Sequence, residues 1–308
     1  MFQRHNEPTS HPLIRTVSAL SEKKVGASSL LNEGKEYLKK EDYKKAEKKF
    51  KEALNQFIKN NDLNGIAESE TYLGIVSQHQ NNLKKAKEHF EKALKLHEDL
   101  DYKPGISRVY TNMGALTLLL SKDFEKALEL HQKALDISEK AQDFQGMSRA
   151  LTNIGYVKFR QQKLEEALNI LKEALELAKK ANCESIQATA LSNIGIILFN
   201  MKRYNEALEK HKEVAQIFEK WGNKKRLAME HRQMGLILEK LNRYDEAENH
   251  YKTAEKLYHE TGLKKEEKMV KSMFKTAKAS MRKCQSCGTI IMVPELTYCP
   301  NCNAELKT

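Results

Sequence analysis

The segment RALTNIG, residues 149–155, ends in a glycine that has a counterpart about every 40 residues along the chain. Successive gaps of 40, 40, 41, 40 and 40 residues separate six such glycines. A fixed period of this size is typical of a stack of similar structural units. Because a glycine inside a helix costs roughly 1 kcal/mol relative to alanine, its recurrence indicates a close approach between two helices. The six are Gly34, Gly74, Gly114, Gly155, Gly195 and Gly235.

A second pattern follows each glycine. An alanine comes twelve or thirteen residues later, then a large side chain after four residues, then a small residue or valine. In segments such as KKAEKKFKEAL (44–54) and EEALNILKEAL (165–175), the apolar residues recur at helical spacing. We therefore predict a helix A with the glycine and a helix B with the alanine, each about 16–18 residues long. The glycine is expected to face the first alanine, and the large histidines to keep a polar tip in solvent. The large residues are Phe50, Phe90, His131, Leu171, His211 and Tyr251.

These residues resemble the tetratricopeptide repeat (TPR), whose signature places a small residue, two alanines and a large residue at this spacing. The usual unit has about 34 residues, whereas the unit here has 40. That length and the phrases RVYTNMG (108–114) and RALTNIG (149–155) look most like the Pins/LGN cell-polarity adaptors and rapsyn-like scaffolds. The resemblance implies an all-α fold, a right-handed TPR superhelix of six helix-turn-helix repeats. The expected repeats are 28–62, 63–102, 103–142, 143–182, 183–222 and 223–262.

Charge and composition describe the segments outside the repeats. The formal net charge of +11 divides into +2 for residues 1–27, +5 for residues 263–282, zero for residues 283–308 and +4 for the repeats. Residues 1–27 contain two prolines and no apolar h-region, so we expect a flexible tail and a cytoplasmic protein. The amphipathic segment 263–282 is predicted to cap the last repeat. Contact of this basic helix with nucleic acid or an acidic lipid surface stays an alternative.

Two cysteine pairs near the C-terminus predict a metal site. Cys284 and Cys287 form the first CxxC pair, and Cys299 and Cys302 form the second, eleven residues further on. Four thiolates close a tetrahedral site that suits one structural Zn²⁺ ion and leaves no open position. The β-prone stretch between the pairs predicts a short hairpin, and residues 283–308 resemble a zinc ribbon. A rubredoxin-like iron site is the alternative, and disulfides are disfavoured in a cytoplasmic protein.

The TPR resemblance implies that a ligand lies along the concave face formed by the A helices. The position two before each glycine carries Asn32, Tyr72, Asn112, Asn153, Asn193 and Gln233. A side-chain amide both donates and accepts, so it can pair with a peptide unit of any sequence. In the Pins/LGN-like adaptors, asparagines at this position clamp an extended peptide, which implies that role for Asn112, Asn153 and Asn193. The alternative is that these amides tie neighbouring helices together.

Arginines beside these amides indicate an acidic ligand, because guanidinium pairs bidentately with carboxylates. Arg108 and Arg149 lie six residues before their glycines, and Arg160 and Arg232 are expected to face the same groove. Solvated surface charge is the alternative. Apolar contacts are expected from Tyr156, Phe159, Ile196 and Phe199.

The sequence contains no phosphate-binding glycine loop, no nucleophile–base pair at a recognisable spacing and no metal site with an open position. We therefore predict a non-enzymatic adaptor that binds an extended acidic peptide in repeats 3 to 5. The alternative is a nucleic-acid-associated factor that uses the basic helix and the ribbon as its contact surface.

Overall fold

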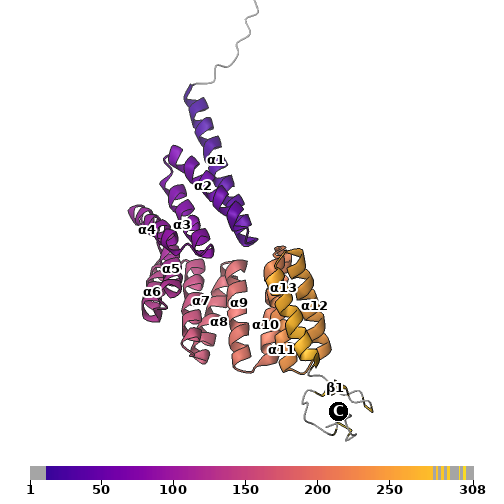
Figure 1. The fold of residues 1–308 in the computed structure, drawn as a ribbon. Helices are drawn as coiled ribbons and strands as arrows, with labels where there is room; N and C mark the ends of the chain where they lie inside the picture. Colours follow the sequence, from indigo (N-terminus) through magenta and orange to yellow (C-terminus); the bar gives the residue numbers. More distant parts are fainter. Residues whose placement is uncertain are drawn as a thin grey trace, which may run out of the picture. The chain divides into compact units, whose positions relative to one another are not determined.

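The computed structural model describes residues 12–279 and, further on, residues 282–283, 286–287, 290–291, 298 and 301–302; side chains are described for residues 26–273, 286–287, 298 and 301–302. From Pro12 to Ala279 the described chain is helical (Figure 1). It forms two compact units, Met1–Asn193 and Ile194–Thr308, and the boundary falls within helix α9. The helices are α1 Pro12–Lys39, α2 Tyr43–Lys59, α3 Leu63–His79, α4 Leu83–Asp99, α5 Lys103–Leu120, α6 Phe124–Lys140, α7 Phe144–Arg160, α8 Leu164–Lys180, α9 Glu184–Asn200, α10 Tyr204–Lys220, α11 Lys224–Lys240, α12 Tyr244–Glu260 and α13 Lys264–Ala279.

The helices alternate between the two predicted types, with the odd-numbered ones as A helices and the even-numbered ones as B helices. Helices α2 to α12 have 17 residues each, apart from α5 with 18, which confirms the predicted length. In the first unit, each helix from α1 to α7 packs against the next one. Consecutive A helices of that unit also contact each other, α1 with α3, α3 with α5 and α5 with α7. The A helices therefore share one side of this unit. In the second unit, α10 packs on α11, α11 on α12 and α12 on α13.

Short turns with a left-handed residue reverse the chain between helices. Asn61 and Asn81 have φ values of 52° and 61°, and asparagine tolerates this conformation better than most residues. Several helices then start with a capping side chain: Asp62 accepts a hydrogen bond from the Gly65 amide at 3.0 Å. Such a cap satisfies one of the unpaired amides at a helix start. The turn chemistry thus fixes where each helix ends and the next begins.

The repeated glycines face the large side chains of the B helices, which corrects the expectation that they face the first alanine. A Cβ atom on Gly74 would lie 2.5 Å from Phe90 Cε1, and one on Gly155 would lie 2.7 Å from Leu171 Cγ. The alanine lies one helical turn before the large residue, so both are on the same face. The longer side chain reaches the glycine first and fills the space between the two helices, which leaves no room for a side chain at the glycine position.

A second glycine series, which the sequence analysis missed, joins consecutive repeats. Gly65, near the start of α3, packs against the Phe57 ring at the end of α2. Gly105 packs in the same way against the His97 ring. The first series therefore brings helices A and B of one repeat together, and the second brings helix B to the next helix A.

Helix α1 begins earlier than the sequence analysis predicted. It spans 28 residues from Pro12 to Lys39, so residues 12–27, expected to belong to a flexible tail, are helical. Proline is well placed at a helix start because its missing amide hydrogen would have no partner there. Leu13, Val17 and Leu20 follow at helical spacing. Residues 1–11 of the predicted tail lie outside the described residues.

A thirteenth helix and a pair of short strands follow the twelfth helix. Helix α13 packs against α12, and its Val270 side chain is fully buried. Strand β1, Arg282–Lys283, then pairs antiparallel with β2, Ile290–Ile291, with Arg282 opposite Ile291. These strands flank the first cysteine pair. Among the described helices, none is both long enough and apolar enough to cross a bilayer.

Candidate functional site

A cluster of charged side chains occupies the A helices of the first unit. Glu68 on α3 lies 2.9 Å from Lys35 Nζ on α1 and 3.5 Å from Arg108 Nη1 on α5, both measured to its Oε1 atom. Burial alone would raise the pKa of Glu68, but the hydrogen bonds and charges of Lys35 and Arg108 outweigh it and lower that pKa. Glu68 is therefore an ionised carboxylate shared by two cations.

Arg149 on α7 adds a third cation near this cluster. Burial lowers the pKa of its guanidinium, and repulsion from Arg108 lowers it further. Between residues 26 and 273, no carboxylate lies within ion-pair distance of Arg149. The charge of Asp143 raises the pKa of Arg149, but its carboxylate lies outside ion-pair distance. Three cations with one directly paired carboxylate therefore leave an excess of positive charge in a half-buried environment, where charges are screened less than at an open surface.

Unpaired donors accompany this charge. Nδ2 of Asn112 and Nε of Arg108 are both buried without a hydrogen-bond partner. Buried polar atoms of this kind are uncommon in folded proteins because each one costs free energy. His97 lies close by, and burial together with the Arg108 charge lowers its pKa to about 4, so it is neutral at pH 7. The donors and the charge therefore both favour an anion that also accepts hydrogen bonds.

The other predicted amides differ in their use. Asn112, Asn153 and Asn193 are half-buried, whereas Asn32 is exposed. Nδ2 of Asn153 donates to the Arg149 carbonyl at 2.9 Å, within its own helix. The side-chain oxygen of Asn153 takes no part in that bond and can accept another one. Tyr72, which breaks the row of amides, stacks on Phe50 at a centroid distance of 5.0 Å.

The predicted aromatic and arginine residues of α7 form their own contacts. Arg160 donates through Nη1 to the Tyr156 hydroxyl at 3.0 Å. Its guanidinium lies 5.8 Å from the Tyr156 ring centroid and 5.9 Å from that of Phe124. Phe159 is half-buried. Arg160 is thus an exposed cation held over two rings.

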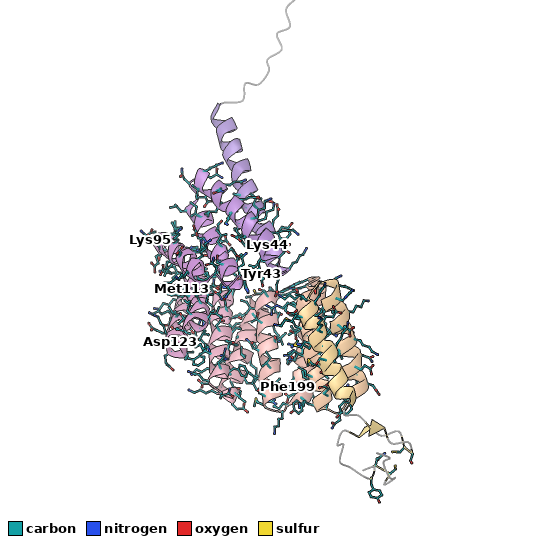
Figure 2. All side chains as sticks on the ribbon, in the orientation of Figure 1. Tyr43, Lys44, Lys95, Met113, Asp123 and Phe199 are labelled. Carbon is teal, nitrogen blue, oxygen red and sulfur yellow. The ribbon has the colours of Figure 1, made fainter. Side chains whose placement is uncertain are left out.

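The second unit holds the remaining predicted residues of the groove. Phe199 on α9, labelled in Figure 2, lines a pocket with Ile196, His211 and residues of α11. Arg232 on α11 is half-buried, its Nε atom has no hydrogen-bond partner, and its Nη1 atom lies 3.9 Å from Met269 Sδ.

The two large histidines are buried, contrary to the expectation of a polar tip in solvent. His131 is 0% exposed and His211 is 2% exposed. His211 Nδ1 lies 2.6 Å from Glu230 Oε2, whereas neither ring nitrogen of His131 has a partner. The ring that packs on the glycine must lie between the two helices, which leaves no route for its tip to water.

Two of the four predicted metal ligands lie within the described residues. Cys287 and Cys302 are exposed, and Nδ2 of Asn301 lies 3.9 Å from Cys287 Sγ. Because Asn301 precedes Cys302, this contact brings the second CxxC segment to the first. Cys284 and Cys299 lie outside the described residues, and the described part of the chain contains no cluster of three metal-ligating side chains.

Two members of the charged cluster, Lys35 and Glu68, were not predicted from the sequence. Lys35 follows Gly34 directly, and Glu68 lies six residues before Gly74, the same offset as Arg108 and Arg149 from their glycines. Glu68 therefore occupies the same repeat position as the two predicted arginines. Comparing the charges at this position across the repeats would have identified it as a partner for them.

Comparisons with known proteins agree with this architecture. The family model described as the MalT-like TPR region matches residues 15–205, and a tetratricopeptide repeat model matches residues 186–260. No curated protein sequence matches the chain.

Solved structures of TPR-like proteins are similar at low sequence identity. BtubC from P. vanneervenii has 17% identity and a TM-score of 0.55, and the match covers 79% of this chain and 92% of that one. A Rap protein complexed with competence and sporulation factor has 15% identity and a TM-score of 0.58, with 81% and 74% coverage. The APC/C hetero-tetramer Cut9-Hcn1 has 17% identity and a TM-score of 0.62, with 84% and 46% coverage. At these identities the similarity shows the fold alone.

Proposed function

Because the chain belongs to the MalT-like TPR family, we propose that it is a non-enzymatic adaptor whose first unit binds an extended acidic segment of a protein partner. The observation that carries this proposal is the state of Arg149. Its guanidinium is half-buried beside Arg108 and has no carboxylate partner between residues 26 and 273. A ligand carboxylate would supply the missing negative charge.

The cluster suggests how such a ligand is held. A carboxylate between Arg108 and Arg149 relieves the repulsion between the two guanidinium groups and accepts hydrogen bonds from both. The unpaired Nδ2 of Asn112 then donates to a neighbouring peptide carbonyl. Glu68 holds Lys35 and Arg108 in place, as the distances of 2.9 and 3.5 Å indicate. The ligand side chain thus takes the place of a second carboxylate in the cluster.

The finer assignments rest on the resemblance to Pins/LGN-like adaptors. Asn153 offers its side-chain carbonyl to a peptide amide, and Asn193 offers a complete amide group. Tyr156 and Phe159 supply apolar surface on α7, next to the exposed Arg160. In the first unit, an extended backbone bound through amides and rings would depend little on ligand sequence outside the acidic position.

Fluorescence anisotropy with a labelled peptide of alternating glutamate and alanine tests this proposal. Arg149→Glu should weaken binding by about 30-fold or more, because it reverses a charge in a half-buried site. The matched control is Lys95→Glu, which makes the same change on the exposed face of α4 (Figure 2). Equal losses in both variants, or none in Arg149→Glu, would contradict the proposal. Tight binding of a labelled oligonucleotide that weakens steeply with salt would favour the nucleic-acid alternative instead.

We further propose that residues 283–308 hold one structural zinc ion through Cys284, Cys287, Cys299 and Cys302. The contact between Asn301 and Cys287, and the strand pair that flanks the first CxxC, support this set of ligands. Four thiolates are a preferred zinc environment, and so small a segment needs metal to fold. Metal analysis of the purified protein should find about one zinc per chain and a loss in Cys284→Ser/Cys287→Ser. Iron in place of zinc would support the rubredoxin-like alternative.

A further inference from the structure

The second unit contains a pocket that no part of the proposed acidic site uses. Its volume is about 60 Å³, and it lies between α9, α10 and α11. His211 and Ile237 are buried and form its floor, whereas the other four lining residues are partly exposed around its mouth. These four are Ile196, Phe199, Gln233 and Leu236.

The lining selects an apolar guest. Ile196, Phe199, Leu236 and Ile237 present carbon surface, and the polar groups are the amide of Gln233 and the ring of His211. The orientation of the His211 ring is fixed, because its Nδ1 atom pairs with the buried Glu230 at 2.6 Å. Gly195 packs against the same ring, where a Cβ atom would lie 2.7 Å from Nε2. The floor is therefore rigid, and the pocket can discriminate by shape.

The volume limits the size of the guest. A cavity of about 150 Å³ is known to hold one benzene molecule, so 60 Å³ is too small for an aromatic ring. It accommodates the branched end of a valine, leucine or isoleucine side chain. The amide of Gln233 at the mouth can pair with the backbone of the residue that carries this side chain.

The charge near the pocket indicates that the bound side chain belongs to an acidic peptide. Arg232 precedes Gln233, and among the described residues it has no carboxylate within ion-pair distance. Helix α13 contains six lysines but two glutamates, and its Met269 Sδ lies 3.9 Å from Arg232 Nη1. A peptide with acidic residues next to an aliphatic one is complementary to both features.

We infer that this pocket binds one aliphatic side chain of an acidic peptide, with an acidic neighbour of that residue paired to Arg232. The inference rests on the proposed function, because it names the second feature by which the ligand is recognised. Acidic peptides without an aliphatic residue should bind more weakly, and those with an aromatic residue should gain nothing from it.

Fluorescence anisotropy on the full chain tests the inference with a labelled glutamate–alanine host peptide that carries one guest residue. Leucine or valine as the guest should bind about tenfold more tightly than glycine, and tryptophan no more tightly than glycine. Leu236→Trp fills the pocket and should abolish the preference for leucine. Leu119→Trp, which changes an exposed leucine of α5, is the matched control and should keep it.

Two further variants separate this inference from the proposed function. Arg149→Glu should weaken all guests equally and leave the leucine-to-glycine ratio unchanged. Ile196→Ala enlarges the pocket and should shift the preference toward phenylalanine, which tests the pocket even where Leu236→Trp disturbs folding. Binding of all peptides without guest preference would overturn the pocket but not the acidic site. A preference that survives both pocket variants would place the guest elsewhere, and no binding of any acidic peptide would overturn the proposed function.

Discussion

His131 in the first unit and His211 in the second occupy the same position of the repeat, yet their environments differ. Both rings are buried against a glycine of the paired A helix. His211 pairs with the buried Glu230, and the surface above it is apolar. Neither nitrogen of His131 has a partner. The arginines and asparagines of that unit lie on the A helices. The packing position is thus constant, while the groups around it differ from repeat to repeat.

This contrast separates what builds the scaffold from what selects a ligand. The contact between glycine and large residue recurs in both units and depends on shape alone. The positions around it combine arginines and asparagines with Tyr156 and Phe159 in the first unit. In the second unit they combine Arg232 with the pocket residues Ile196, Phe199 and Leu236. Changes to the shared contact should therefore damage stability, and changes to the variable positions should alter binding.

The largest effect is expected where the shared contact is broken. A Cβ atom on Gly114 would lie 2.5 Å from His131 Cε1, and valine would add two further methyl groups. We expect Gly114→Val to lower the free energy of unfolding by about 3 kcal/mol, because the added methyl groups overlap the packed ring. Urea denaturation followed by circular dichroism measures this loss.

A glycine outside the shared contact provides the control. Gly222 has a φ of 63° and no atom within 4 Å of an added Cβ, so Gly222→Ala should cost only about 1 kcal/mol of backbone strain. An equal loss in the two variants would show that conformation, not packing, explains the repeated glycines.

A smaller effect should distinguish the two histidines. His211→Leu leaves the buried Glu230 side chain without its hydrogen-bond partner, so the free energy of unfolding at pH 7 should fall by about 2 to 3 kcal/mol. His131→Leu introduces the residue that the fourth repeat has at this position, Leu171, and removes two unpaired nitrogens. Its stability should change by less than about 1 kcal/mol. Similar losses in the two variants would mean that the Glu230 contact contributes little.

The sequence predicted the part of this comparison that depends on periodicity. Glycine, alanine and large residues in register predicted paired helices of the observed length, because each contact recurs at a fixed offset. The offset alone did not reveal that His211 meets Glu230, 19 residues away on the following A helix. Pairing between helices depends on the direction of the side chains, which the repeat period does not give.

The pocket and the start of helix α1 were missed for related reasons. Ile196 and Phe199 were expected to contribute apolar contacts, but a pocket is defined by the space left between residues of three helices. The polar composition of residues 1–27 favoured a tail, although a proline followed by apolar residues at helical spacing is compatible with a helix start. Arg108 and Arg149 were named from their offsets, but their shared burial required the structure.

The pH dependence of stability tests the burial of His131. Burial lowers the pKa of His131 to about 4, whereas an unfolded histidine titrates near pH 6.5. The unfolded chain therefore binds more protons between these values, and stability should fall as pH decreases from about 6.5 and level off near 4. At pH 5 the contribution of His131 should be a loss of about 2 kcal/mol. Urea midpoints of wild type and His131→Leu measured from pH 8 to pH 4.5 should diverge below pH 6.5, and parallel curves would contradict the prediction.

The smallest effect concerns the variable positions, where charge and shape can be separated at Arg149. Arg149→Lys keeps the positive charge but replaces a planar fork of donors with a single ammonium group. If the acidic ligand is held mainly by charge, its affinity should change by less than about twofold. If a carboxylate pairs bidentately with the guanidinium, as we propose, the affinity should fall by about threefold to tenfold. Anisotropy with the glutamate–alanine peptide measures this difference. The corresponding change in the second unit, Arg232→Lys, should matter only for peptides that carry an aliphatic guest, because that residue can anchor its acidic neighbour only when the pocket is filled.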